Sequence, residues 1–227
     1  WAEVLIGFAL LFMGLDALKE SVPNLKENTE FLAFLSSYAN MGIISTLIFI
    51  GVGTILTLVV QSSSAAMALT LVMCYEGYIP FDLAAAMVLG ENIGTTITAN
   101  LAALVGNVHA KRAARAHFIF NIFGVIWMIF AFQFFINSID SYMISNMDLS
   151  PVSSVGESVA VPIGLSIFHT TFNILNVLLF VWFVPLIART VIRMQPSKGE
   201  TDEEFHLEHI GGGLMQTAEL SVLEAQK

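Results

Sequence analysis

The sequence predicts an all-α, polytopic membrane protein with a re-entrant helical hairpin and a discontinuous transmembrane helix. Composition is the first indication: 56% of the 227 residues are hydrophobic and 12% are charged, whereas a soluble domain carries about a quarter charged residues. The second is the presence of apolar stretches that reach the roughly 20 residues needed to cross a bilayer. The third is a pair of polar interruptions inside such stretches, at residues 61–64 and 90–96.

The same composition excludes several classes of protein. A single cysteine, Cys74, excludes a disulfide framework. Nine basic residues stand against eighteen acidic ones, and no basic run is longer than Lys111–Arg112, which excludes a nucleic-acid binder. Many of the acids lie beyond Gly199, so the net charge of −9 mainly describes a polar tail and does not indicate the ligand.

Four apolar stretches are predicted to cross the membrane: residues 2–18, 83–105, 113–136 and 159–192. The stretch 41–79 is too long for one span and barely long enough for two, and polar Gln61–Ser64 lies near its middle. Two half-helices that meet at this tetrad resolve both difficulties, because broken backbone at membrane depth is tolerated only inside protein or beside a wet cavity. Residues 137–157 are polar and turn-rich, and they are predicted to form a loop.

The basic residues near the predicted span ends are Lys111, Arg112, Arg115, Arg189, Arg193 and Lys198. They form two sets separated by two spans, and basic residues near span ends favour the cytoplasmic side. We therefore expect a multi-pass protein of the cell (inner or plasma) membrane, with the 137–157 loop outside. The transmembrane unit covers residues 1–195, and the tail, residues 196–227, is cytoplasmic.

The polar tetrad Gln61-Ser62-Ser63-Ser64 is the first candidate site. Burying a polar side chain in an apolar membrane segment costs free energy unless the side chain has a partner. Such residues therefore indicate a functional site first. If a half-helix starts just after the tetrad, its free N–H groups and positive dipole end point back at these side chains. Hydroxyls and amides together would form a neutral cradle for an oxyanion. A single serine would more simply bond its own helix, but four adjacent polar residues favour a binding site.

The second interruption runs from Gly90 to Thr96 and continues to Thr98 and Asn100. Two glycines four residues apart are compatible with close helix packing. Their combination with Asn and Thr instead favours an unwound segment whose oxygens bind a small cation. Glu91 could bind that cation, carry a proton or cap the half-helix, and its sequence position leaves these alternatives open.

Two later segments share the pattern His-x-x-Phe-Asn, with His117 and Asn121 in one and His169 and Asn173 in the other. These positions share one helix face. We interpret them first as structural contacts between membrane helices, with a proton relay as the less favoured alternative. Neither spacing resembles a metal site.

Enzymatic functions fit less well. No serine has the strand–turn–helix context of a nucleophile elbow, and three adjacent serines resemble an anion cage more than one activated nucleophile. An intramembrane hydrolase using Ser63 with His117 or His169 stays a third hypothesis. The chain lacks a phosphate-binding Gly-rich loop with lysine, so ATP is not expected as its energy source.

The tetrad, followed by Gly90-x-Asn92-Ile93-Gly94-Thr95-Thr96, resembles the bacterial branch of the type II sodium–phosphate cotransporter family. That family carries two inverted repeats, each with one copy of both motifs, and this chain holds one copy of each. The resemblance implies that the chain is the second repeat, followed by the start of a PhoU-like cytoplasmic domain. A missing first repeat or a homodimer partner would then complete the transporter. Glu91 departs from the family pattern, where alanine is the commoner residue.

By this resemblance, Gln61, Ser62, Ser63 and Ser64 would bind inorganic phosphate, and Gln61, Asn92, Thr95 and Thr96 would bind sodium. The expected function is sodium-dependent phosphate symport across the bilayer, without an enzymatic activity and without a cofactor other than the coupling ion Na+. No basic residue lies between Lys26 and Lys111, so co-bound sodium would supply the charge that balances phosphate.

Three alternatives stay open beside this one: transport of another oxyanion, phosphate export, and a non-transporting membrane regulatory subunit that binds a partner through the acidic tail. Thr98, Asn100, His117, Asn121, His169 and Asn173 are candidate site residues without an assigned role.

Overall fold

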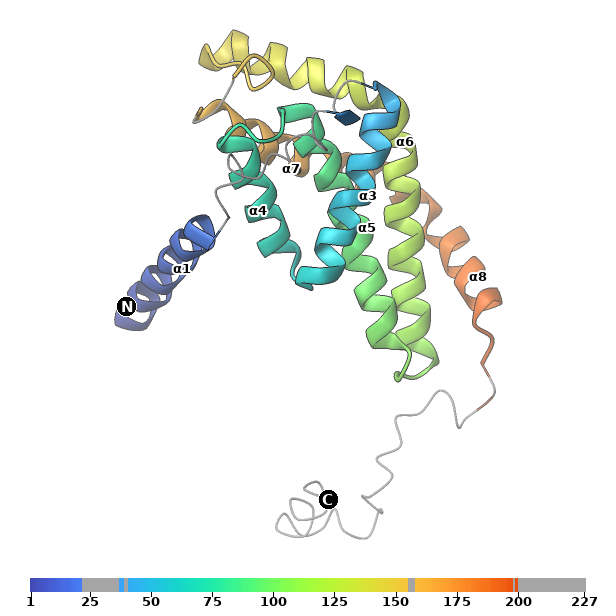
Figure 1. The fold of residues 1–227 in the computed structure, drawn as a ribbon. Coiled ribbons are helices and arrows are strands. Elements are labelled where there is room, and N and C mark those ends of the chain that lie inside the picture. Colours follow the sequence, from blue (N-terminus) through green and yellow to red (C-terminus); the bar gives the residue numbers. More distant parts are fainter. Residues whose placement is uncertain (22–36, 39–40, 155–157, 198, 200–227) are drawn as a thin grey trace.

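The computed structural model describes residues 1–21, 37–38, 41–154, 158–197 and 199, and the regular structure within these ranges is helical. The helices are α1 (Ala2–Ser21), α3 (Ile43–Val60), α4 (Ser63–Tyr75), α5 (Phe81–Ala103), α6 (Val108–Met147), α7 (Ala160–Phe180), the 3₁₀ turn η2 (Val181–Phe183) and α8 (Val184–Met194). The predicted all-α architecture is confirmed for these residues (Figure 1). Of the predicted tail, residues 196–227, residue 198 and residues 200–227 lie outside the described residues.

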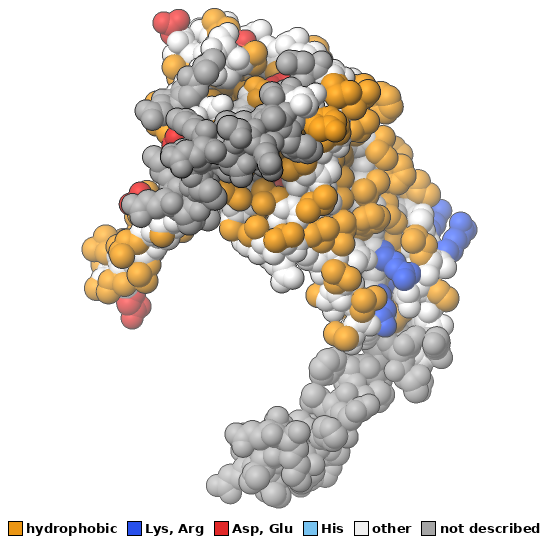
Figure 2. Space-filling view, in the orientation of Figure 1, with side chains coloured by type: hydrophobic (Ala, Val, Ile, Leu, Met, Phe, Trp, Pro, Cys, Tyr) orange, Lys and Arg blue, Asp and Glu red, His pale blue; other side chains and the backbone are white. Residues whose placement is uncertain are grey.

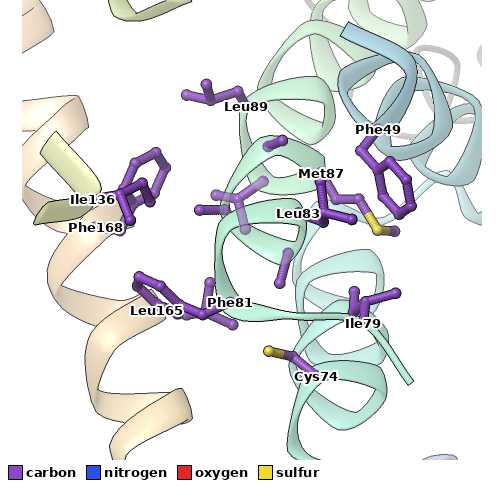
Figure 3. Packing of buried hydrophobic residues seen from close by; sticks show 14 of the residues in the cluster. Phe49, Cys74, Ile79, Phe81, Leu83, Met87, Leu89, Ile136, Leu165 and Phe168 are labelled. Atoms are coloured by element: carbon purple, nitrogen blue, oxygen red, sulfur yellow. The ribbon is translucent and has the colours of Figure 1, made fainter. Parts of the chain in front are cut away.

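Helix α5 is the centre of the structure. It contacts α3, α4, α6 and α7, and its first half, from Leu83 to Glu91, is buried without interruption. Figure 3 shows Leu83, Met87 and Leu89 of α5 within the cluster of apolar side chains that includes Phe49 of α3 and Phe168 of α7. A helix buried on all sides in this way is typical of the interior of a bundle.

Helices α3 and α4 form a V whose apex is Gln61–Ser62 (Figure 1). Helix α3 ends because Gln61 adopts the left-handed conformation, with φ of 56°. Ser62 is extended and caps α4, since its hydroxyl accepts a hydrogen bond from the Ala65 N–H at 3.3 Å. The expected reversal of the chain at the tetrad is therefore present, and its depth in a membrane stays a prediction.

The expected break in α5 is absent, because the helix continues through Gly90 and Gly94. These glycines serve close packing instead. A Cβ atom on Gly90 would overlap the backbone of Ile50 in α3, and one on Gly94 would lie 2.8 Å from the Thr54 carbonyl oxygen. Thr54 Oγ1 also donates a hydrogen bond to the Gly90 carbonyl oxygen at 3.0 Å. The glycines thus allow two helix backbones to touch, and they do not unwind α5.

The predicted loop at 137–157 begins later than expected, because α6 continues to Met147. Ile136, Ile139 and Met143 are all buried. Their spacing places them on one helix face. This part of α6 is mostly polar, but the three apolar side chains form a stripe that is buried against the rest of the structure. In Figure 1, α6 bends and its last part crosses the end of the bundle.

The stretch 159–192, expected to be one span, contains two helices separated by the turn η2. Pro185 explains the second start, since proline lacks an N–H and is accepted only in the first turn of a helix. Helix α8 ends against the start of α6, where Arg112 Nε donates to the Gln195 carbonyl oxygen at 3.0 Å and Arg115 donates to that of Met194 at 2.8 Å.

Many hydrophobic side chains lie at the surface of the described residues on the face seen in Figure 2. Phe130 is 86% exposed and Trp182 83% exposed, a degree of exposure that suits lipid contact more than water. Among the described residues, three helical stretches are long and apolar enough to cross a membrane. They are Ile43–Val60, Val108–Met147 and Ala160–Met194, the last of which comprises α7, η2 and α8. Basic side chains gather at one end of the view in Figure 2, where α6 begins and α8 ends.

The contact between α3 and α5 generates a prediction. Gly90→Ala should lower the apparent unfolding temperature in detergent, because its Cβ overlaps backbone that no rotamer change can move, and overpacking costs about 1–3 kcal/mol. Gly51→Ala in α3 is the matched control, since no atom lies within 4 Å of its added Cβ. Equal unfolding temperatures for both variants would contradict the close backbone contact.

Candidate functional site

A polar cavity of about 360 Å³ lies among α4, α5, α6 and α7. Its lining residues are Ser63, Ser64, Met67, Val88, Glu91, Asn92, Thr95, His117 and His169. Both polar interruptions of the sequence therefore contribute to one site, together with the histidine of each His-x-x-Phe-Asn segment.

Helix α4 contributes Ser63 and Ser64 from its first turn. The first N–H groups of a helix have no partner within that helix, and Ser62 uses its hydroxyl to accept the N–H of Ala65. The amides of Ser63 and Ser64 have no hydrogen-bond acceptor among the described residues. Two hydroxyls and the positive end of a helix thus meet at the cavity, which is an arrangement suited to an anion.

Helix α5 contributes a polar stripe that faces away from its glycines. Asn92 and Thr95 line the cavity, whereas Gly90 and Gly94 face α3. Asn92 donates its amide N–H to the Val88 carbonyl oxygen at 3.1 Å, and Thr95 donates its hydroxyl to that of Glu91 at 2.9 Å. Donating these hydrogens leaves the side-chain oxygens of Asn92 and Thr95 as acceptors or cation ligands.

The cavity contains one carboxyl group. Glu91 is 4% exposed, and its Oε1 accepts a hydrogen bond of 2.6 Å from the hydroxyl of Thr70 in α4. Thr70 itself is fully buried. Sequence reasoning missed Thr70, although it lies two helical turns after Ser63 and therefore on the same face of α4.

His117 of α6 and His169 of α7 reach the same cavity. Their asparagine partners do not: Asn121 donates to the His117 carbonyl oxygen at 3.1 Å, and Asn173 donates to that of His169 at 2.8 Å. Both bonds lie within one helix, and no hydrogen bond from Asn121 or Asn173 to another helix is formed among the described residues. Sequence reasoning missed the pair that does bridge α6 and α7, in which Trp127 donates to Asn176 at 3.0 Å.

The other candidate residues from the sequence lie outside the cavity lining. Gln61 and Ser62 are exposed at the apex of the V. The remaining ones, which bond backbone carbonyls, are Thr96, Thr98 and Asn100. Asn100 also joins α5 to α6 through the Ala114 carbonyl oxygen at 2.9 Å.

Within the part of the chain that the structure describes, neither lysine nor arginine lines the polar cavity. Arg112 lines a different cavity, of about 590 Å³, between α6 and α8. An anion in the polar cavity would therefore meet hydroxyls, amides and imidazoles, and any further positive charge would have to enter with it.

Residues 32–145, which contain both motifs and most of the cavity lining, match the sequence profile of the Na+/Pi-cotransporter family. The chain belongs to that family. The resemblance expected from the two motifs is thereby confirmed, and the family is one of phosphate transport proteins.

Curated relatives of this Na+/Pi-cotransporter family chain come from bacteria and animals. The uncharacterized protein YqeW of Bacillus subtilis is 30% identical over 65% of this chain and 43% of its own length. YjbB of Escherichia coli K12, provisionally named an inorganic phosphate export protein, is 22% identical over 98% of this chain and 37% of its own. Human sodium-dependent phosphate transport protein 2B is 38% identical over 44% of this chain and 14% of its own length. The chain thus spans less than half of each relative, and no solved structure matches it.

The cap of α4 generates a prediction about the site's architecture. Ser62→Ala should lower the unfolding temperature, because loss of a helix N-cap costs about 1 kcal/mol. Ser62→Thr should retain most of the stability, because its hydroxyl can still accept the Ala65 N–H. A Ser62→Ala protein as stable as the wild type would show that this cap does not hold the start of α4.

Proposed function

We propose that this chain forms one half of a sodium-dependent inorganic phosphate symporter. The observation that carries the proposal is the single cavity that brings Ser63 and Ser64 of α4 together with Asn92 and Thr95 of α5. The first pair supplies hydrogen-bond donors for phosphate, and the second pair supplies oxygens of the kind that small hard cations prefer.

The charge balance of the cavity supports coupling to a cation. Phosphate is negative at neutral pH, and an uncompensated charge in a membrane interior is costly. Since no described lysine or arginine lines the cavity, a co-transported sodium ion would supply the positive charge at the site. Sodium would then be part of the binding site as well as the source of energy.

The exposed apex supports a role as half of a transporter. Gln61 and Ser62 are exposed, although both belong to the motif that the family resemblance assigns to phosphate. We propose that an inverted first repeat, or a second copy of this chain, packs against the apex and brings these two residues into the complete site. Alternating access would follow from one half moving against the other.

Phosphate export is the second candidate function. It is favoured by one observation: YjbB, whose provisional name is that of an exporter, aligns with 98% of this chain. The same cavity would serve both directions, since the sodium gradient and the membrane orientation decide the direction of net transport.

The serines provide the direct test of phosphate binding. In proteoliposomes containing the complete protein, Ser63→Ala with Ser64→Ala should raise the half-saturating phosphate concentration by about tenfold or more, because each hydrogen bond to a charged ligand contributes about 1.5–3 kcal/mol. Ser166→Ala is the matched control, since Ser166 is exposed on α7 and bonds only the Pro162 carbonyl oxygen. Unchanged phosphate dependence in the double variant would contradict the proposed site.

The orientation can be tested with single cysteines, because Cys74 is the sole cysteine. In a Cys74→Ala background, Ser153→Cys should react with a membrane-impermeant maleimide in intact cells. Ala110→Cys, near the basic end of α6, should react only after the membrane is opened. Both native positions are exposed. The reverse labelling pattern would invert the proposed topology.

A further inference from the structure

One of the two carboxylate oxygens of Glu91 has a hydrogen-bond donor among the described residues. Oε1 accepts a hydrogen bond from Thr70, whereas no described residue donates to Oε2. Glu91 lines the polar cavity, so the remaining oxygen is available to whatever the cavity holds. A buried carboxylate with a single hydroxyl donor is unfavourable unless a further partner binds it.

No lysine or arginine among the described residues lines the cavity beside Glu91. Arg112 and Arg115 instead donate hydrogen bonds to the end of α8. The titratable groups that share the cavity are His117 and His169. Neither histidine forms a hydrogen bond or ion pair with Glu91 among the described residues.

A carboxylate beside Ser63 and Ser64 also opposes the binding of an oxyanion. Two negative groups that line one cavity of about 360 Å³ repel each other. The repulsion disappears when a cation binds the carboxylate, and the same cation then attracts the phosphate. The position of Glu91 therefore suits a group that makes anion binding depend on a cation.

We propose that Glu91 is a ligand of a monovalent cation in this cavity, together with the side-chain oxygens of Asn92 and Thr95. The inference rests on the proposed phosphate symport and deepens it. It assigns to Glu91 the cation role that its sequence position left open. Thr70 is a positioning residue, because its hydroxyl holds Oε1 and leaves Oε2 for the cation.

The arrangement also links the two halves of the site. Thr70 lies on α4, the helix that carries Ser63 and Ser64, whereas Glu91 lies on α5 beside Asn92. Helix α4 carries the phosphate donors, and the hydrogen bond of 2.6 Å between Thr70 and Glu91 connects this helix to the carboxylate. A cation bound by Glu91 would therefore influence the position of α4 through this bond.

The test compares Glu91→Gln with the wild type in the complete protein, reconstituted in proteoliposomes. We expect the half-activating sodium concentration for phosphate uptake to rise by about tenfold or more, because the substituted amide keeps the shape of the side chain but loses its charge. The ratio of labelled sodium to labelled phosphate should fall by one ion. Asp82→Asn in the first turn of α5 is the matched control, since Asp82 does not line the cavity, and it should behave as the wild type.

Sodium binding without transport provides a second measurement if the variant is inactive. In purified protein without phosphate, replacing choline by sodium should raise the unfolding temperature of the wild type and of Asp82→Asn. The rise should be lost in Glu91→Gln. It should be reduced in Thr70→Val and retained in Thr70→Ser, which keeps the hydroxyl that positions Glu91.

The outcomes separate this inference from the proposed function. A wild-type protein that takes up no phosphate would overturn the proposed function itself. Sodium-dependent uptake that is the same in the wild type and in Glu91→Gln would leave that function standing and overturn the inference. A Glu91→Gln protein with unchanged sodium dependence and an altered pH dependence would show that Glu91 carries a proton, which also overturns the inference.

Discussion

The contact between α3 and α5 is the interaction on which the rest of the described structure depends. Its closeness comes from Gly53 and Gly90, where a Cβ on either residue would meet the backbone of the opposite helix. Side chains therefore do not separate the two helices, and Thr54 adds a hydrogen bond across them. Because the glycine face of α5 packs against α3, the residues on its other side point into the cavity. These residues are Glu91, Asn92 and Thr95.

The sequence allowed the helical class and the chain reversal at Gln61–Ser62 to be predicted, because these depend on local features. Of the residues expected to bind phosphate or sodium, Ser63, Ser64, Asn92 and Thr95 line the cavity, and their roles stay predictions. A polar tetrad inside an apolar stretch marks a break wherever it lies, and an Asn/Thr-rich stripe marks a polar helix face. The continuity of α5 could not be predicted in the same way. Gly90 permits unwinding and close packing equally well, and only the presence of α3 against it decides between them.

The remaining differences have similar causes. The extension of α6 to Met147 depends on three apolar residues that are sparse in a polar segment and become significant only when a partner surface buries them. The bond from Trp127 to Asn176 joins residues 49 positions apart, and nothing in either local sequence indicates the other. Glu91 was recognised as unusual from the sequence, but its relation to Thr70 required the packing of α4 on α5.

The hydrogen bonds from Arg112 and Arg115 to the last carbonyl groups of α8 have a mechanical consequence. They tether the end of α8 to the first turns of α6, so the polypeptide that follows Gln195 leaves from a fixed anchor on that helix. A force on this polypeptide would therefore be transmitted to α6, which carries His117, through these hydrogen bonds, as well as along α8 to α7.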